Sequence, residues 1–226
     1  MPKTLALIHT SMVFVNVETM MKDMFAEIMP DVRLVNIVDD SLLPDVMATG
    51  VIDDDVQKRM SAYVKAAEDT GADAVLSLCS SLGPTIDPTR ETVEIPVIKI
   101  DDPMTRRAVE LGANIGVMAT VPTTLGPTID LIQQNADEMG KEVTIHDCLM
   151  EGAFQILMSG DKEKHDQMVI DAARELAKQV DIIVFAQASM TRLAQMVEGV
   201  TGLQVLTSSR LAIEYAKSVL DAIAFE

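Results

Sequence analysis

Basic residues are scarce in this sequence of 226 residues. Lysine and arginine together number 18, against 35 aspartate and glutamate residues, so the formal net charge is −17. Nucleic acids and anionic membranes are both bound through basic surfaces. We therefore expect neither as a partner. The net charge does not argue against a small anionic ligand, because such a ligand responds to the local field around it.

Cysteine is equally rare, and the chain contains only Cys79 and Cys148. Two cysteines provide no disulfide framework and favour a reducing compartment, so we expect a cytoplasmic protein. Tryptophan is absent, and the chain has only two tyrosines and five phenylalanines, whereas it has 16 methionines. This composition predicts a core built largely of flexible aliphatic side chains.

The sequence also lacks long apolar runs and several common motifs. No apolar run reaches the roughly 20 residues that a membrane-spanning helix needs. The first run, at residues 4–10, predicts a strand rather than a secretion signal. The chain contains no glycine-rich phosphate loop, no CxxC pair, no HExxH and no GxSxG. We therefore expect no cofactor, no metal site and no membrane association.

What the sequence does contain is an alternation of strands and helices. Short apolar runs predict strands at residues 4–10, 32–38, 73–79, 95–100, 114–120, 142–148, 181–187 and 203–207. Amphipathic segments predict helices at residues 17–29, 53–70, 103–111, 124–138, 162–179, 190–198 and 208–223. Acidic runs such as "IDDD" at residues 52–55 are typical of helix starts. This order predicts an α/β fold with mostly parallel sheets.

An internal repeat divides this pattern in two. The stretches "DAVLSLCSSL" and "DIIVFAQASM" align without a gap at an offset of 108 residues, which places Gln187 at the position of Cys79. A similar strand lies upstream of each stretch, so we expect His9 to relate to Cys79 roughly as Thr120 relates to Gln187. The repeat predicts two similar α/β lobes facing each other.

Polar residues gather where four of the predicted strands end. These clusters are residues 9–11, 79–81, 120–124 and 187–189. Ligands of open parallel sheets bind at the carboxyl ends of the strands. We therefore expect the four clusters to converge on one cleft.

Cys79 has the most evident chemistry in these clusters. It is followed by "SSLG", and a helix that began there would bind an anion through its free N–H groups and would lower the pKa of the thiol. The thiolate would then act as a base or as a nucleophile. The alternative is a buried and inert cysteine at the end of a strand.

Two other clusters leave similar alternatives open. The hydroxyl groups of Thr120, Thr123 and Thr124 would either bind a carboxylate or cap a helix. His9 is the histidine at the end of a predicted strand. It would orient a substrate or exchange a proton, or else it would fill a structural position.

Four longer stretches carry a family resemblance. They are "CSSLGPT", "GVMATVPTTLGPTI", "EGAFQILMSGDKEKHD" and "DIIVFAQASMTRL", and with the repeat they extend over most of the chain. Together they resemble the aspartate/glutamate/hydantoin racemase superfamily. The resemblance implies two Rossmann-like α/β lobes related by a pseudo-twofold axis, which bind a small carboxylate in the cleft between them without a cofactor or a metal. It also implies that a thiol on each side exchanges protons with the substrate carbon.

Carried over to this chain, the resemblance implies a set of site residues. Cys79 matches the first thiol, whereas the second falls on Gln187, and an amide does not exchange protons near neutral pH. Gln187 would instead donate a hydrogen bond to an enolate-like oxygen. The expected substrate-binding residues lie in the four clusters and are His9, Thr10, Ser11, Ser80, Ser81, Thr120, Thr123, Thr124, Ala188 and Ser189.

Three functions are compatible with these residues. One is an isomerase or racemase-family enzyme on an amino acid, a hydroxy or keto acid, or a dicarboxylate, with Cys79 transferring a proton or adding to the substrate. Another is a single-thiol lyase or decarboxylase with the same fold. The third is a ligand-binding relative without catalysis. The resemblance further implies one lobe of residues 1–100 and 207–226, another of residues 101–206, and a homo-oligomer of unspecified size.

Overall fold

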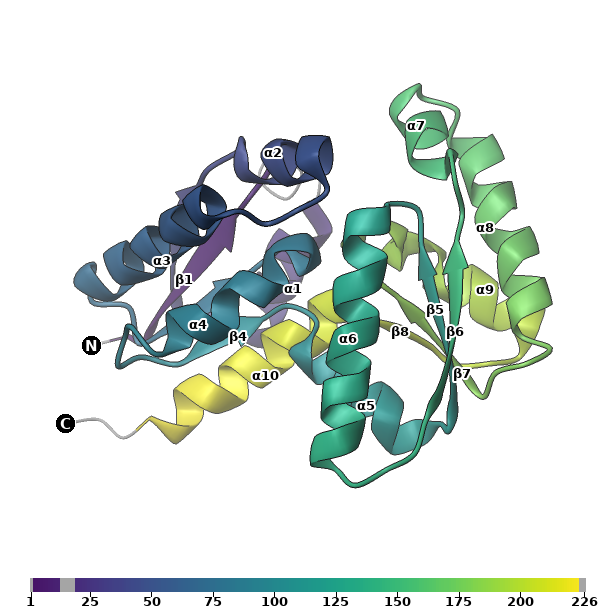
Figure 1. Cartoon of the computed structure of the whole chain (residues 1–226). Coiled ribbons are helices and arrows are strands. Elements are labelled where there is room, and N and C mark those ends of the chain that lie inside the picture. Colours follow the sequence, from purple (N-terminus) through teal and green to yellow (C-terminus); the bar gives the residue numbers. More distant parts are fainter. Residues whose placement is uncertain (1, 13–18, 224–226) are drawn as a thin grey trace. The chain divides into compact units, whose positions relative to one another are not determined.

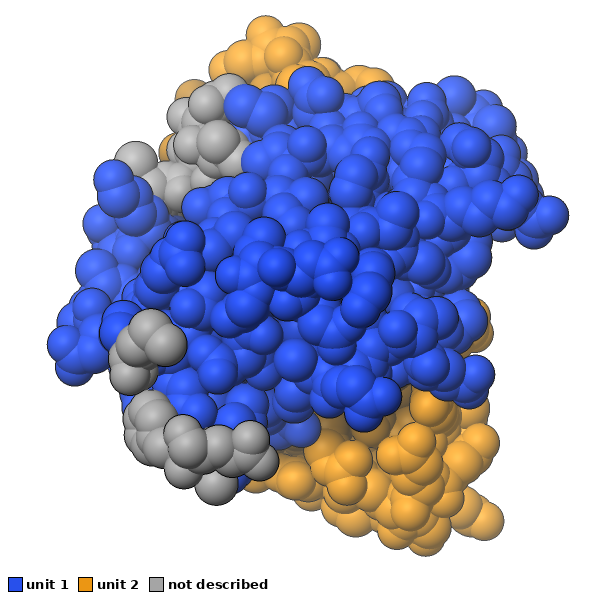
Figure 2. Space-filling view, turned by 90° about the vertical axis from the view of Figure 1, so that its left-hand side faces the viewer, with its two compact units in different colours: residues 1–100, 209–226 blue, residues 101–208 orange. Residues whose placement is uncertain are grey.

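The computed structural model describes residues 2–12 and 19–223. The chain divides into two compact units, one of residues 1–100 and 209–226 (unit 1) and one of residues 101–208 (unit 2), which Figure 2 shows in two colours. Each unit is built on one parallel sheet with helices packed against it (Figure 1). The fold is therefore of the α/β class with two similar lobes, as the sequence predicts.

The sheet of unit 1 has four strands among the described residues. The strands are β1 (Thr4–His9), β2 (Arg33–Val38), β3 (Ala74–Ser77) and β4 (Val97–Lys99), all parallel and in the order β2-β1-β3-β4. The helices are α1 (Thr19–Ile28), α2 (Leu42–Thr49), α3 (Asp54–Asp69), the 3-10 helix η2 (Ser80–Thr85), α4 (Ile86–Arg90) and α10 (Ser208–Ala222). The strand order reverses between β1 and β3, which is where ligands of such sheets bind.

The sheet of unit 2 repeats this order. Its strands are β5 (Asn114–Ala119), β6 (Thr144–Leu149), β7 (Ile182–Phe185) and β8 (Val205–Thr207), all parallel and in the order β6-β5-β7-β8. Its helices are α5 (Asp102–Leu111), α6 (Pro122–Glu138), α7 (Ala153–Met158), α8 (Lys162–Leu176), the 3-10 helix η3 (Ala188–Leu193) and α9 (Ala194–Thr201). The corresponding switch point lies between β5 and β7.

The short helices differ from the sequence prediction. Each predicted strand is present, but α2, α4, α7 and both 3-10 helices were not predicted, and η3 delays the start of α9 to Ala194. Helices of a few residues lack a long periodic pattern and are stabilised by tertiary packing instead. Residues 17 and 18 of the predicted first helix lie outside the described residues.

The sheet of unit 1 carries an apolar core on each face. Leu7 belongs to the core formed with α1 and α10, whereas Ile8 belongs to the core formed with α2, α3 and α4. Successive side chains of a strand alternate between the two faces. Cys79 packs against the second core, whereas His9 continues the row of Leu7 on the first face.

The register of the two sheets fixes which residues correspond in the repeat. Ile8 pairs with Ser77 in unit 1, and Met118 pairs with Phe185 in unit 2. Ser77 and Phe185 are equivalent positions of the repeat, because they are 108 residues apart. Ile8 is therefore the counterpart of Met118, although these two residues are 110 positions apart.

This register corrects one expectation. Thr10, two residues beyond Ile8, is the counterpart of Thr120, and His9 is not. The segment from β1 to β3 is two residues longer than the segment from β5 to β7, and this difference displaced the sequence alignment. Thr10 is thus the residue that relates to Cys79 as Thr120 relates to Gln187.

Candidate active site

Cys79 lies at the carboxyl end of β3, immediately before η2. Its backbone is extended, with φ −143° and ψ 112°, and the chain turns into the 3-10 helix at Ser80. The Cys79 side chain is half-buried against the core that includes α2, α3 and α4. Thr10 is buried just beyond the end of β1, on the same face of the sheet. Cys79 and Thr10 therefore mark the switch point of the unit 1 sheet.

The serines predicted around Cys79 differ in exposure. Ser11 and Ser80 are half-buried, whereas Ser81 is only 1% exposed. Ser80 and Ser81 begin η2, which runs for six residues and leads directly into the five-residue helix α4. The helix start that the sequence indicates after Cys79 is present in the form of a 3-10 helix. The first N–H groups of a helix have no partner within the helix itself.

His9 is buried at the end of β1, on the other face of the sheet. Its Nε2 lies 2.8 Å from Oδ1 of Asn36 on β2, and because an amide oxygen only accepts, Nε2 carries the proton. Burial lowers the pKa of His9, and the hydrogen bond to Asn36 opposes this effect only in part, so the ring is neutral at pH 7. These contacts favour a structural position for His9 rather than direct action beside Cys79.

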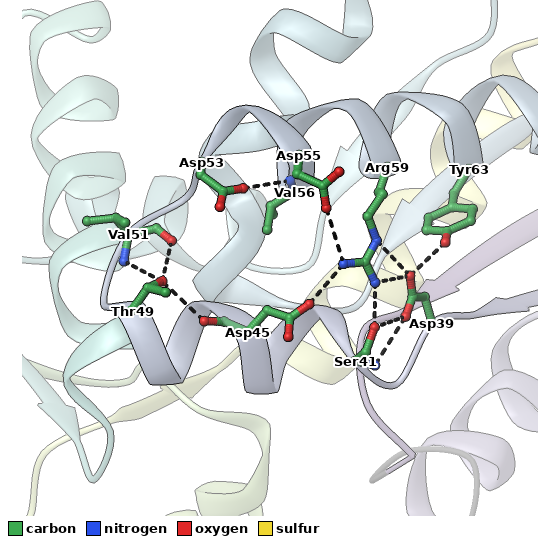
Figure 3. A network of polar contacts seen from close by, with 10 residues as sticks. All are labelled: Asp39, Ser41, Asp45, Thr49, Val51, Asp53, Asp55, Val56, Arg59 and Tyr63. Carbon is green, nitrogen blue, oxygen red and sulfur yellow. Dashed lines mark hydrogen bonds and ion pairs between the residues drawn. The ribbon is translucent and has the colours of Figure 1, made fainter.

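A polar network that the sequence did not indicate surrounds the end of β2 (Figure 3). The carboxylate of Asp39 accepts hydrogen bonds from Oη of Tyr63 at 2.6 Å, from Oγ of Ser41 at 2.7 Å and from Nε of Arg59 at 3.2 Å. Burial alone would raise the pKa of Asp39, but the hydrogen bonds from Tyr63, Ser41 and Arg59 outweigh it and hold the pKa well below its usual range. Asp39 is therefore ionised and engaged, and it is a poor candidate for proton transfer.

The network also holds the segment that follows β1. The N–H of Asp39 donates to the carbonyl oxygen of His9 at 3.0 Å, and the N–H of Leu43 donates to the carbonyl oxygen of Thr10 at 3.1 Å. Arg59 and Tyr63 are four residues apart and so share one face of α3. Their spacing could be read from the sequence, but their partner could not, because tertiary packing brings Asp39 to them.

Gln187 occupies the corresponding place in unit 2, at the carboxyl end of β7. Its amide oxygen accepts hydrogen bonds from the backbone N–H of Thr120, from the hydroxyl of Thr120 at 3.0 Å and from the backbone N–H of Val121 at 3.2 Å. Because all three of these groups are donors, the amide oxygen must face them. Gln187 is only 9% exposed. Its side chain therefore fastens the end of β7 to the start of α6.

This contact separates the roles of the two ends of the Gln187 amide. The oxygen is engaged with Thr120 and Val121, so the N–H₂ group is the end that is suited to donate to a ligand. Neither end exchanges a proton near neutral pH. The hydroxyl proton of Thr120 is directed at Gln187 and not at a substrate.

The remaining predicted residues of unit 2 lie nearby. The hydroxyl of Thr124 donates to the carbonyl oxygen of Val121 at 2.8 Å, at the start of α6, which matches the capping alternative for this threonine. Thr123, Ala188 and Ser189 are half-buried, and the last two begin η3. The structure thus brings the predicted residues of unit 2 to one edge of its sheet.

An ion pair that was not predicted anchors η3. The guanidinium of Arg192, on η3, contacts both carboxylate oxygens of Asp166 on α8, with Nη1 at 2.6 Å from Oδ2. The hydrogen bond from Arg192 lowers the pKa of Asp166, and the opposing effect of burial is smaller. Nδ1 of the buried His165 lies 2.9 Å from Oδ1 of the same carboxylate. These contacts hold the turn that follows Gln187.

Cys148 does not take the place of a second thiol at the edge of unit 2. It lies within β6, where it pairs with Met118, and it is therefore two residues short of the level of Thr120. Burial, and to a smaller extent the charge of Asp147, raise the pKa of the Cys148 thiol. A thiol with a raised pKa is mostly protonated near neutral pH and reacts slowly.

The part of the chain that the structure describes offers no group of three or more His, Cys, Asp or Glu side chains arranged to hold a metal ion. Over the same residues, no helix combines the length and the apolar character that crossing a bilayer requires. The chemistry of the described site therefore has to be argued from Cys79, Gln187 and the donors around them.

The repeated strand order and the thiol at one switch point define a duplicated α/β protein with a candidate site at the strand ends. The chain belongs to the Asp/Glu/Hydantoin racemase family, whose sequence model matches residues 15–216. This confirms the resemblance that the sequence motifs carry. No curated protein is similar enough in sequence to count as a match.

Several solved structures share the fold. Glutamate racemase isoform RacE1 from Bacillus anthracis is 16% identical, with a TM-score of 0.77 over 97% of this chain and 82% of that chain. Aspartate racemase from Picrophilus torridus is 15% identical, with a TM-score of 0.70 over 96% of this chain and 94% of that chain. Unliganded arylmalonate decarboxylase is 14% identical, with a TM-score of 0.59 over 98% of this chain and 94% of that chain. These likenesses concern the fold.

Proposed function

We propose that this protein is a cofactor-independent isomerase-type enzyme that acts on a small carboxylate through Cys79. The observation that carries the proposal is the difference between the two repeat positions. The end of β3 presents a thiol, whereas the end of β7 presents an amide whose oxygen is already engaged. Membership of the racemase family supports an isomerase type of reaction. The glutamate and aspartate racemases among the similar structures support a small carboxylate as substrate.

Two isomerisations need only one thiol. In the first, the Cys79 thiolate removes a proton from a carbon beside a carbonyl or carboxyl group, the C–H electrons pass into an enolate, and the thiol returns the proton at the same or a neighbouring carbon. In the second, the thiolate adds to an activated double bond, the new single bond rotates, and the thiolate leaves again. Gln187 supplies no proton in either case, so both differ from racemisation between two thiols.

Hydroxyl and backbone donors at the strand ends would stabilise the negative charge of the substrate and of the enolate. We assign this role to Ser80 and Ser81 in unit 1 and to the N–H₂ group of Gln187 in unit 2. Such donors act at short range and do not depend on net charge. This accounts for anion binding by a chain whose formal net charge is −17.

A single-thiol decarboxylase is the second candidate, and the engaged amide of Gln187 favours it. In that reaction the bond to the departing CO2 breaks, its electron pair stays on the substrate carbon, and the Cys79 thiol donates one proton to that carbon. One proton donor is sufficient, so the absence of proton exchange at Gln187 is no obstacle. The likeness to arylmalonate decarboxylase gives this candidate further support.

Incubation with small acids in D2O, followed by NMR spectroscopy, tests these candidates. The acids are amino acids, hydroxy and keto acids, unsaturated dicarboxylates and substituted malonates. For proton transfer we expect deuterium in a recovered or isomerised substrate, and for thiol addition an interconversion of cis and trans isomers. Cys79→Ala should abolish either signal, and Cys148→Ser, the matched control, should retain it because the Cys148 thiol is disfavoured as a thiolate.

The other outcomes separate the remaining functions. Release of CO2 with a product one carbon shorter would replace the leading proposal by the decarboxylase. Binding of an acid without turnover, unchanged in Cys79→Ala, would overturn both candidates and identify a ligand-binding protein.

A further inference from the structure

A buried lysine lies in the same unit as Cys79, at the carboxyl end of the neighbouring strand. Lys99 is the last residue of β4, and its side chain is only 6% exposed. Lysine is rarely buried to this degree unless it has a charged partner. The partner is Asp87 on α4, whose Oδ2 lies 2.8 Å from Nζ of Lys99.

The stem of Lys99 runs beneath the 3-10 helix that Cys79 introduces. A Cβ atom added to Gly83 of η2 would lie 3.8 Å from Cδ of Lys99, which is ordinary van der Waals contact. Lys99 is also the ladder partner of Ser77, and Cys79 lies two residues beyond Ser77 on the same face of the sheet. The spacing of strands and residues puts the Cα atoms of Lys99 and Cys79 about 8 Å apart.

We propose that Lys99 is a positioning residue that stabilises the thiolate of Cys79 through its charge. This inference rests on the proposed function, because it concerns the group that is proposed to react there. Ser77 and Gly83, which lie around the path from Lys99 to Cys79, are both buried. The field of the ammonium group therefore passes through protein rather than water and is only weakly screened.

The partner of Lys99 does not cancel this field. The Asp87 side chain is 47% exposed, so water screens its charge more than it screens the buried ammonium group. Asp87 also accepts from Nη1 of Arg90 at 3.1 Å, so one carboxylate is shared between two cations. The net field that this group of charges exerts on Cys79 is therefore positive.

Other titratable and charged groups lie on the elements around this end of the sheet. They are His9, Asp39, Asp45, Asp55, Arg59, Tyr63, Asp87 and Arg90, and Asp101 and Asp102 follow β4 in the chain. Asp39, Asp45, Asp55, Arg59 and Tyr63 form one network of ion pairs and hydrogen bonds (Figure 3). Their charges are largely balanced within that network, so Lys99 is the group whose removal should shift the Cys79 titration most.

The rate at which iodoacetamide modifies Cys79, measured against pH in a Cys148→Ser background, tests the inference directly. Lys99→Met keeps the apolar stem and removes the charge. We expect its thiol titration to shift to higher pH and its modification at pH 7 to slow by about tenfold. Lys99→Arg keeps the charge and should titrate like the parent protein. Lys65→Met, which removes an exposed lysine of α3, is the matched control and should change nothing.

Asp87→Asn provides a second test that leaves the lysine in place. Removing the carboxylate leaves the positive charges unopposed, so modification of Cys79 should become faster and the titration should shift to lower pH. This variant also decides the question if Lys99→Met fails to fold. Titrations that are unchanged in both variants, or equally raised in Lys99→Met and Lys99→Arg, would overturn the inference.

Failure of the inference is distinguishable from failure of the proposed function. The inference depends on the difference in thiol titration between the parent protein and its charge variants, and it needs no substrate. The proposed function depends on turnover of a small acid and on the loss of turnover in Cys79→Ala. A parent protein that turns over substrate but titrates like Lys99→Met would refute only the role of Lys99.

Discussion

The carboxyl ends of β3 and β7 are equivalent places in two copies of one fold, yet they carry different side chains. The backbone of Cys79 has φ −143° and ψ 112°, and that of Gln187 has φ −138° and ψ 131°. Each residue is followed by a six-residue 3-10 helix. The main chain of the repeat is therefore preserved, and the chemical difference between the two ends resides in one side chain.

The two ends also differ in how they are fastened. In unit 2 the fastening group is Gln187 itself, whose oxygen binds the end of β5. In unit 1 the segment beyond β1 is held instead by the β2–α2 segment, with Asp39 and Arg59 at its centre (Figure 3). Separating the fastening from the thiol leaves Cys79 able to react, whereas the same place in unit 2 serves stability first.

Replacing Gln187 should have the largest effect on stability. Gln187→Leu removes the acceptor and leaves two buried N–H groups and one hydroxyl without it, so we expect the free energy of unfolding to fall by about 3 kcal/mol. Urea denaturation measures this loss. Cys79→Ala at the equivalent place should lose much less, because the thiol is half-buried and forms weak hydrogen bonds.

Gln187→Glu is the matched control for this comparison. A carboxylate can accept from the same three donors, so stability at pH 7 should stay close to that of the parent protein. If Gln187→Leu proved as stable as Gln187→Glu, the amide would not be a fastener and the contrast between the two ends would fail.

The Asp39 network should show the next largest effect, with a marked dependence on pH. Asp39→Asn removes charge-assisted hydrogen bonds to Arg59 and Tyr63, and we expect it to lower the free energy of unfolding by about 2 kcal/mol at pH 7. Because the pKa of Asp39 is depressed in the folded protein, its contribution is complete above the unfolded pKa of about 3.9 and is lost as the pH falls further. The difference between parent and variant should therefore shrink below about pH 4.

Asp55 offers the control within the same network. Its side chain is 77% exposed and lies 3.7 Å from Nη1 of Arg59. Exposed ion pairs of this kind contribute little, so Asp55→Asn should change stability by less than about 0.5 kcal/mol at any pH. An equal loss in Asp55→Asn and Asp39→Asn would mean that general charge, and not the buried contact, supports unit 1.

The sequence predicts the strands and the repeat well because both follow from local apolar runs. It also identifies Cys79 and Gln187 as equivalent positions, which needs only an offset. What it does not predict are contacts between segments far apart in the chain, such as Gln187 with Thr120 and Asp39 with Arg59. Those depend on which strands are neighbours and on their register.

His9 shows how a small local difference misleads the sequence comparison. Two additional residues between β1 and β3 moved the alignment so that His9 took the place of Thr10. In a strand, such a displacement by one residue transfers a side chain to the opposite face of the sheet. The candidate site accordingly includes Thr10 beside Cys79, with His9 turned towards Asn36.

The helix starts that precede β3 and β7 provide the smallest and most symmetrical test. Asp53 caps α3 by accepting from the N–H of Val56 at 2.9 Å, and Asp161 caps α8 by accepting from the N–H of Lys164 at 3.1 Å. These two aspartates are themselves 108 residues apart, so the repeat includes its helix caps. Asp53→Ala and Asp161→Ala should each lower the free energy of unfolding by about 1 kcal/mol.

The control for this last pair is Asp54→Ala, in the first turn of α3 but without a capping contact among the described residues. It should lose only a few tenths of a kcal/mol, through the helix dipole alone. Equal losses at Asp53 and Asp161 would show that the two units conserve the energetics of their scaffold as well as its geometry. The functional divergence would then be confined to the strand ends, where one copy keeps a thiol and the other an amide. A loss at one cap alone would show that the copies have also diverged in what stabilises them.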